Sequence, residues 1–213
     1  MATVRLVNGR GRFAPYALGT CLLGLGATMV VFTGYAAALG EPVEGFLATA
    51  AIAGGLGLPL LRLGRVTSEP GRREALLAVL LIWSVVPAIG AVPFVVTGGM
   101  SPLNALFESM SAFTTTGATV LSDFGAFTSS LFMWRAAAQW IGGIGIIVIF
   151  VSLFPRLAIA GRQLFFTEAP GPTEERLTPK LRHTATTLLT VYGGLTVACA
   201  LAYWAAGMTL TQA

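Results

Sequence analysis

The chain is 213 residues long, 55% hydrophobic and only 10% charged, and its mean hydropathy is +0.78. Soluble domains carry about a quarter charged residues, so this composition excludes an ordinary soluble fold and indicates a protein embedded in a lipid bilayer. The formal net charge is +4, but the basic residues do not form one dense patch, which argues against a nucleic-acid partner.

Five apolar stretches are long enough to cross a bilayer, whose hydrocarbon core of about 30 Å needs about 20 helical residues. The predicted spans are residues 15–39, 45–61, 75–96, 131–154 and 186–208. Pro87 and Pro93 are expected to kink the third span. A sixth apolar segment, residues 102–113, is too short to cross, because at about 1.5 Å per residue it reaches roughly halfway.

The basic residues predict the orientation of these spans. Of the 13 Lys and Arg residues, all but Arg135 lie before the first span, between the second and third, or between the fourth and fifth. The positive-inside rule therefore predicts a multi-pass membrane protein with a cytoplasmic N-terminus. In this topology the short segment must enter from the outer face and return, which is typical of a pore loop.

The short segment also has the local signals of a pore helix. Ser101 is a good N-cap, and Pro102 is a good first helical residue. The helix is expected to end near Thr114 to Gly117, where the partial negative charge of its C-terminus favours a cation. The run Thr-Thr-Thr-Gly-Ala-Thr at 114–119 can turn several carbonyl oxygens to one side, as in potassium selectivity filters. The alternative for this run alone is an ordinary polar turn between helices.

Three motifs in this order resemble the Trk/Ktr/HKT family of potassium transporters. Residues 107–119 (FESMSAFTTTGAT) are similar to the first pore loop of the family, and residues 139–145 (QWIGGIG) to the inner helix that follows. Residues 163–179 resemble the cytoplasmic link to the second repeat in bacterial TrkH-like members. The resemblance implies a potassium-selective, channel-like subunit built from four helix–pore-loop–helix repeats in one chain.

The resemblance also assigns the residues of the site. The backbone carbonyls of Thr115, Thr116, Gly117 and Ala118 would supply one quarter of the selectivity filter, with potassium bound at Thr115, Thr116 and Gly117. The implied function is potassium uptake across the plasma membrane. Three further pore loops would be needed to close the ring, so this stretch of sequence is expected not to conduct by itself.

The expected partners follow from the same resemblance. They are the lipid bilayer, the potassium ion as transported substrate, a second copy in a homodimer of the full-length protein, and a cytosolic nucleotide-binding regulatory subunit. No cofactor is expected. The sequence has no phosphate-binding Gly-Lys-Ser/Thr loop, no paired carboxylates near a histidine and no metal-ligand spacing, so no enzyme is predicted.

Each of three charged residues near the loop has two interpretations. Glu108 and Asp123 would raise the cation concentration at the outer mouth. Alternatively, Glu108 would bond to neighbouring backbone, and Asp123 would be solvated. Arg135 would extend to the membrane interface, or it would pair with Glu108 or Asp123 and brace the pore loop.

The predicted fold class is all-α transmembrane: a helical hairpin plus one helix–pore-loop–helix repeat and the first helix of a second repeat. The hairpin occupies residues 1–66, the first repeat 67–156, a cytoplasmic connector 157–183, and the first helix of a second, truncated repeat 184–213. Two other functions remain open at this point. One is a non-conducting membrane subunit or truncated remnant, and the other is a secondary transporter whose broken helix binds a small anion or sodium.

Overall fold

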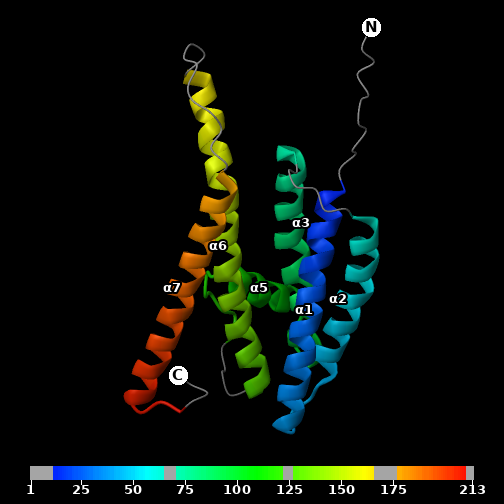
Figure 1. Ribbon diagram of the computed structural model, residues 1–213. Helices are drawn as coiled ribbons and strands as arrows, with labels where there is room; N and C mark the ends of the chain where they lie inside the picture. Colours follow the sequence, from blue (N-terminus) through cyan, green and yellow to red (C-terminus); the bar gives the residue numbers. More distant parts are fainter. Residues whose placement is uncertain (1–11, 65–70, 122–126, 166–176, 210–213) are drawn as a thin grey trace. The chain divides into compact units, whose positions relative to one another are not determined.

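The computed structural model describes residues 12–64, 71–121, 127–165 and 177–209, which form helices joined by short connections (Figure 1). The helices are α1 (Phe13–Ala38), α2 (Glu44–Leu63), α3 (Arg72–Gly90), α4 (Val92–Val96), α5 (Pro102–Phe113), α6 (Ser129–Phe165) and α7 (Leu177–Ala205). Five stretches are long and apolar enough to cross a membrane: Phe13–Ala38, Glu44–Leu63, Arg73–Val96, Ser129–Ile149 and His183–Ala205. The predicted all-α transmembrane fold is confirmed.

The chain divides into two compact units, residues 1–142 and 143–213, and the division falls inside α6. Both α6 and α7 extend beyond the predicted spans: α6 runs to Phe165, and α7 begins at Leu177. Part of the expected connector is therefore helical, while residues 166–176 lie outside the described part of the chain.

Small residues bring α1 and α2 close together. A Cβ atom added to Gly19 would lie 2.9 Å from the carbonyl oxygen of Gly57, and one added to Gly26 would lie 3.6 Å from the Cβ of Ala53. Helices in lipid associate by such close packing, because lipid tails are as apolar as the side chains and give no hydrophobic driving force. Packing thus explains Gly19, Gly26 and Gly57, whereas Gly24, Gly54 and Gly55 have nothing within 4 Å of a Cβ position.

The predicted third span is interrupted where a kink was expected, although Ala91 at the interruption keeps helical backbone angles. The helix α3 ends at Gly90, and the short helix α4 begins after Ala91. Pro93 is the physical cause, because proline has no N–H to donate to the carbonyl four residues earlier and its ring collides with that carbonyl. The chain therefore starts a new turn with Pro93 near its beginning.

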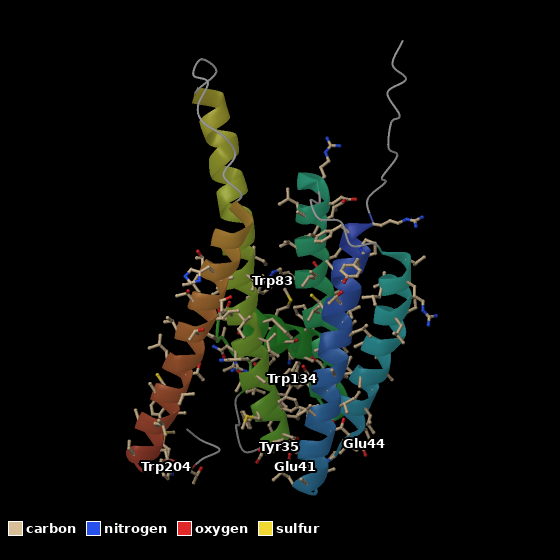
Figure 2. All side chains as sticks on the ribbon, in the orientation of Figure 1. Tyr35, Glu41, Glu44, Trp83, Trp134 and Trp204 are labelled. Carbon is tan, nitrogen blue, oxygen red and sulfur yellow. The ribbon has the colours of Figure 1, made fainter. Side chains whose placement is uncertain are left out.

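Side chains of α5 and α6 bond to two carbonyls near this break. The indole Nε1 of Trp134 donates to the Gly90 carbonyl at 3.0 Å, and the Ser109 hydroxyl donates to the Pro87 carbonyl at 2.6 Å. Both donors are fully buried, and Trp134 is labelled in Figure 2. Buried carbonyls in a membrane protein need such partners. These two hydrogen bonds therefore hold the end of α3 against α5 and α6.

Aromatic rings extend this contact to the hairpin. Phe32 of α1 packs edge-on against Trp134 at 5.5 Å and stacks on Phe46 of α2 at 5.9 Å between ring centroids. Phe113, the last residue of α5, contacts the same indole at 5.9 Å. The core of the first unit thus joins α1, α2, α5 and α6.

Replacing Trp134 by Phe is expected to lower the free energy of unfolding by about 1–3 kcal/mol, because the buried Gly90 carbonyl loses its donor. The measurement is thermal unfolding of the purified protein in detergent. The control is Trp83→Phe, since Trp83 is partly buried on α3 and has no hydrogen-bond partner among the described residues. Equal melting temperatures for the two variants would contradict the role given to the indole N–H.

Candidate functional site

The short helix α5 begins as the sequence predicts. The Ser101 hydroxyl accepts a hydrogen bond from the Asn104 N–H at 3.3 Å, and Pro102 is the first helical residue. With 12 residues, the helix is roughly 18 Å long, which is little more than half of a bilayer core. Figure 1 shows α5 crossing at mid-height beside α3, so its C-terminus lies within the first unit and not at its end.

The helix ends in a Schellman motif with an unusual residue. Thr115 N–H donates to Ala112 O at 2.9 Å, and Thr116 N–H donates to Ser111 O at 3.0 Å. This motif places Thr115 in the left-handed region, with φ at 57°. Glycine normally occupies that position, and an L-residue there costs roughly 1–2 kcal/mol. Gly117 also has a positive φ, of 75°, so the chain turns sharply twice directly after the helix.

This turn leaves some carbonyl oxygens free and engages others. In the part of the chain that the structure describes, no hydrogen bond engages the carbonyls of Thr115 or Thr116. The Gly117 carbonyl has only Arg135 Nη2 at 3.5 Å, the limit of a hydrogen bond. Two adjacent residues thus present bare peptide oxygens at the negative end of the α5 dipole.

The Ala118 carbonyl differs from those of Thr115 and Thr116, because it is engaged within the protein. Its oxygen accepts hydrogen bonds from the Ser111 hydroxyl at 2.5 Å and from Arg135 Nη2 at 3.1 Å. An oxygen with two protein donors has no lone pair left for a cation. Ala118 therefore attaches the loop to α5 and α6.

The carboxylate of Glu108 lies behind the loop. The residue is fully buried, and its Oε1 accepts hydrogen bonds from the Thr119 hydroxyl at 2.5 Å and from the Val120 N–H at 2.6 Å. Its Oε2 accepts the Arg135 Nε–H at 2.8 Å. A buried carboxylate needs this full set of donors. Both carboxylate oxygens of Glu108 therefore have partners within the protein.

Arg135 joins that carboxylate to the loop. Its side chain is 18% exposed, and its guanidinium contacts Glu108 on one side and the Ala118 carbonyl on the other. Of its two interpretations, the structure places it in the pair with Glu108. Asp123 lies outside the described residues.

One face of α6 supports the whole loop. Arg135, Gln139 and Gly142 are spaced so that they share a helix face. The Nε2 of Gln139 lies 3.8 Å from the position of a Gly117 Cβ, and Gly142 lies directly against the Phe113 carbonyl, where a Cβ would overlap that oxygen. The small size of Gly142 is typical of close helix packing in lipid, and its spacing from Arg135 could have indicated this face.

Glu41 contributes a contact that sequence reasoning missed. It lies between α1 and α2, yet its Oε1 accepts the Ser129 N–H at 2.9 Å and its Oε2 the Ser130 N–H at 2.8 Å. Partial burial alone would raise the pKa of the Glu41 carboxyl, but the hydrogen bonds from Ser130 and Ser129 outweigh it and hold the pKa below its ordinary value. No local signal predicts a contact between residues so far apart in the sequence.

The described residues contain no group of three or more His, Cys, Asp or Glu side chains that could hold a metal ion. The bare backbone oxygens after α5 are a different kind of cation ligand. Carbonyl oxygens suit hard, weakly hydrated cations, which lose their water shell when such oxygens replace it.

Comparison with known proteins gives consistent matches. A sequence model of the TrkH family, described as cation transport protein, matches residues 59–212. The chain is 44% identical over 139 residues to the Trk system potassium uptake protein TrkH of Halomonas elongata, covering 64% of this chain and 29% of that protein. It is 36% identical over 144 residues to TrkG of Escherichia coli strain K12, covering 66% and 30%.

The fold has a similar solved structure. The crystal structure of the potassium transporter TrkH from Vibrio parahaemolyticus superposes with a TM-score of 0.76 at 32% identity, covering 95% of this chain and 41% of that one. The chain spans less than a third of the length of the curated relatives it matches.

Proposed function

Because the chain belongs to the TrkH family of cation transport proteins and is a multi-pass membrane protein, we propose that it provides one pore loop of a potassium uptake pathway. The family is one of transporters, not enzymes. The observation that carries the proposal is the pair of bare carbonyls of Thr115 and Thr116 beside Gly117. The similar TrkH and TrkG proteins are named potassium uptake proteins, which favours potassium as the ion.

In this proposal the carbonyls of Thr115, Thr116 and Gly117 face the ion and form one quarter of a channel-like filter. The C-terminus of α5 points toward the same position and favours a positive charge there. Ala118 anchors the loop instead of binding the ion. Equivalent loops elsewhere in the complete protein would supply the other three quarters, as the family resemblance implies.

The proposed topology follows the distribution of basic residues. The N-terminus lies in the cytoplasm, and α5 enters the plasma membrane from the outer face. The proposed division is a hairpin in residues 1–66, the first repeat in 67–156, a connector in 157–183 and the start of a second repeat in 184–213. The proposed partners are a second copy of the complete protein and a cytosolic nucleotide-binding subunit, both by family resemblance.

A secondary transporter with a broken helix receives less support. A broken helix is present at the α3–α4 junction. However, Pro87 and Gly90, next to that break, have their carbonyls bonded to Ser109 and Trp134. The carbonyls after α5 are the ones left bare, so the geometry favours the pore loop as the ion site.

Replacing Gly117 by Ser is expected to reduce the preference for potassium over sodium about tenfold. A Cβ has room, since only Gln139 Nε2 lies within 4 Å, at 3.8 Å. The effect therefore comes from the positive φ, where a side chain costs roughly 1–2 kcal/mol, about one factor of ten. The measurement is potassium and sodium uptake by cells that lack their own potassium transporters and express the complete protein.

The matched control is Gly99→Ser. Gly99 has a φ of 66° and nothing within 4 Å of its Cβ position, so Ser introduces the same backbone strain outside the loop. This control is expected to keep its ion preference. Unchanged discrimination in the Gly117 variant would contradict the filter assignment.

A further inference from the structure

The end of α1 holds Glu41 in a fixed place. Gly40 has a φ of 69°, and its N–H donates to Ala37 O at 3.1 Å, while the Glu41 N–H donates to Ala36 O at 2.9 Å. These two bonds form a Schellman motif, which fixes the backbone on both sides of the turn. The carboxylate of Glu41 therefore extends from a rigid point. Figure 2 shows it at the same end of the hairpin as Tyr35 and Glu44.

The target of this carboxylate is the first turn of α6. The first N–H groups of a helix have no partner within the helix, and Glu41 accepts two of them, from Ser129 and Ser130. The Thr128 and Ser130 hydroxyls bond to each other at 3.1 Å. The Glu41 carboxylate therefore acts as the N-terminal cap that a nearby hydroxyl would otherwise supply. A negative charge is favourable at this end of a helix.

Arg135 lies less than two turns along α6 from this cap. A rigid helix transmits a shift of its first turn to Arg135, and Arg135 bonds both the Glu108 carboxylate and the Ala118 carbonyl. The hairpin and the pore loop are therefore connected by one short helical segment whose outer end Glu41 fixes.

Two other contacts hold the hairpin against the repeat at different places. The Gly45 N–H donates to the Thr97 hydroxyl at 3.2 Å, which joins α2 to the segment after α4. Phe32 packs against Trp134. Glu41 is thus a polar contact that the hairpin makes to the first turn of α6.

We propose that Glu41 is a positioning residue for ion selectivity: it caps α6 from the N-terminal hairpin and so sets the position of Arg135 behind the pore loop. This inference rests on the proposed function and goes beyond it, because it gives the hairpin a part in selectivity.

The experiment compares Glu41→Gln with Glu41→Asp in the complete protein. A Gln side chain has one acceptor oxygen and no charge. The variant therefore loses one of the two hydrogen bonds from the Ser129 and Ser130 N–H groups and weakens the other. We expect amide exchange at Ser129 and Ser130 to rise about fivefold, and the sodium-to-potassium uptake ratio to rise by a similar factor. Asp keeps a carboxylate on the same backbone position. The Glu41→Asp variant is therefore expected to give a sodium-to-potassium uptake ratio closer to that of the unchanged protein.

The control is Glu44→Gln, which removes the same charge from an exposed residue at the start of α2 and is expected to leave both measurements unchanged. Normal exchange and a normal uptake ratio in Glu41→Gln would overturn the proposal. Faster exchange with an unchanged ratio would also overturn it, because the cap would then have no effect on the loop. Absence of potassium uptake by the unchanged protein would contradict the proposed function instead, and the exchange measurement would still decide whether Glu41 caps α6.

Discussion

Replacing Arg135 by Ala is expected to abolish selective potassium uptake and to lower the free energy of unfolding by about 3–5 kcal/mol. The Glu108 carboxylate is fully buried and would keep only the donors of Thr119 and Val120. The Ala118 carbonyl would also lose one of its two donors. The measurements are thermal unfolding in detergent and the uptake of potassium and sodium by cells that express the complete protein.

Three further variants separate the charge of this pair from its geometry. Arg135→Lys keeps the charge but cannot contact the carboxylate and the carbonyl together, so an intermediate loss is expected. Glu108→Gln removes the negative charge, and Arg135→Ala should cost less in that background than in the unchanged protein. The expected interaction energy is about 0.5–3 kcal/mol. Additive losses would contradict the ion pair as the source of stability.

Replacing Gly142 by Ala is the second change with a large expected effect. The new Cβ would overlap the carbonyl oxygen of Phe113, and a backbone atom at the end of a helix cannot rotate away. Overpacking of this kind costs about 1–3 kcal/mol. Either α6 or the end of α5 must move, and both support the loop, so potassium selectivity should fall together with the melting temperature.

The control for Gly142 is the same substitution at Gly55. That glycine lies inside α2 and has nothing within 4 Å of its Cβ position. Alanine is a better helix former than glycine by about 1 kcal/mol, so Gly55→Ala should be neutral or stabilising. A Gly142→Ala variant that melts and transports like Gly55→Ala would contradict the close approach of α6 to α5.

Most of the fold could be predicted because lipid restricts the choices. A spanning segment must be helical and about 20 residues long, so five apolar stretches and one half-length segment define the order of elements. The Ser101 cap was predicted for local reasons. The break at Ala91 was predicted only as a kink, since two prolines in a span do not indicate whether the helix bends or restarts.

Less of the candidate site could be predicted. Gly117 was expected to have unusual backbone angles, but the left-handed Thr115 was not, because β-branched residues rarely adopt that conformation. The engagement of the Ala118 carbonyl depends on Arg135, whose partner the sequence left open between Glu108 and Asp123. Such contacts depend on packing between separate helices, which periodicity and spacing do not specify.

The left-handed conformation of Thr115 has a consequence for biogenesis. A nascent chain that has inserted only as far as α5 lacks Arg135. The Schellman bonds of Thr115 and Thr116 and the bond from Ser111 to the Ala118 carbonyl are local and can form at this stage, whereas the Glu108 carboxylate still lacks its charged partner. The left-handed backbone of Thr115, which costs roughly 1–2 kcal/mol, is therefore supported by the full set of loop contacts only after α6 has entered the bilayer.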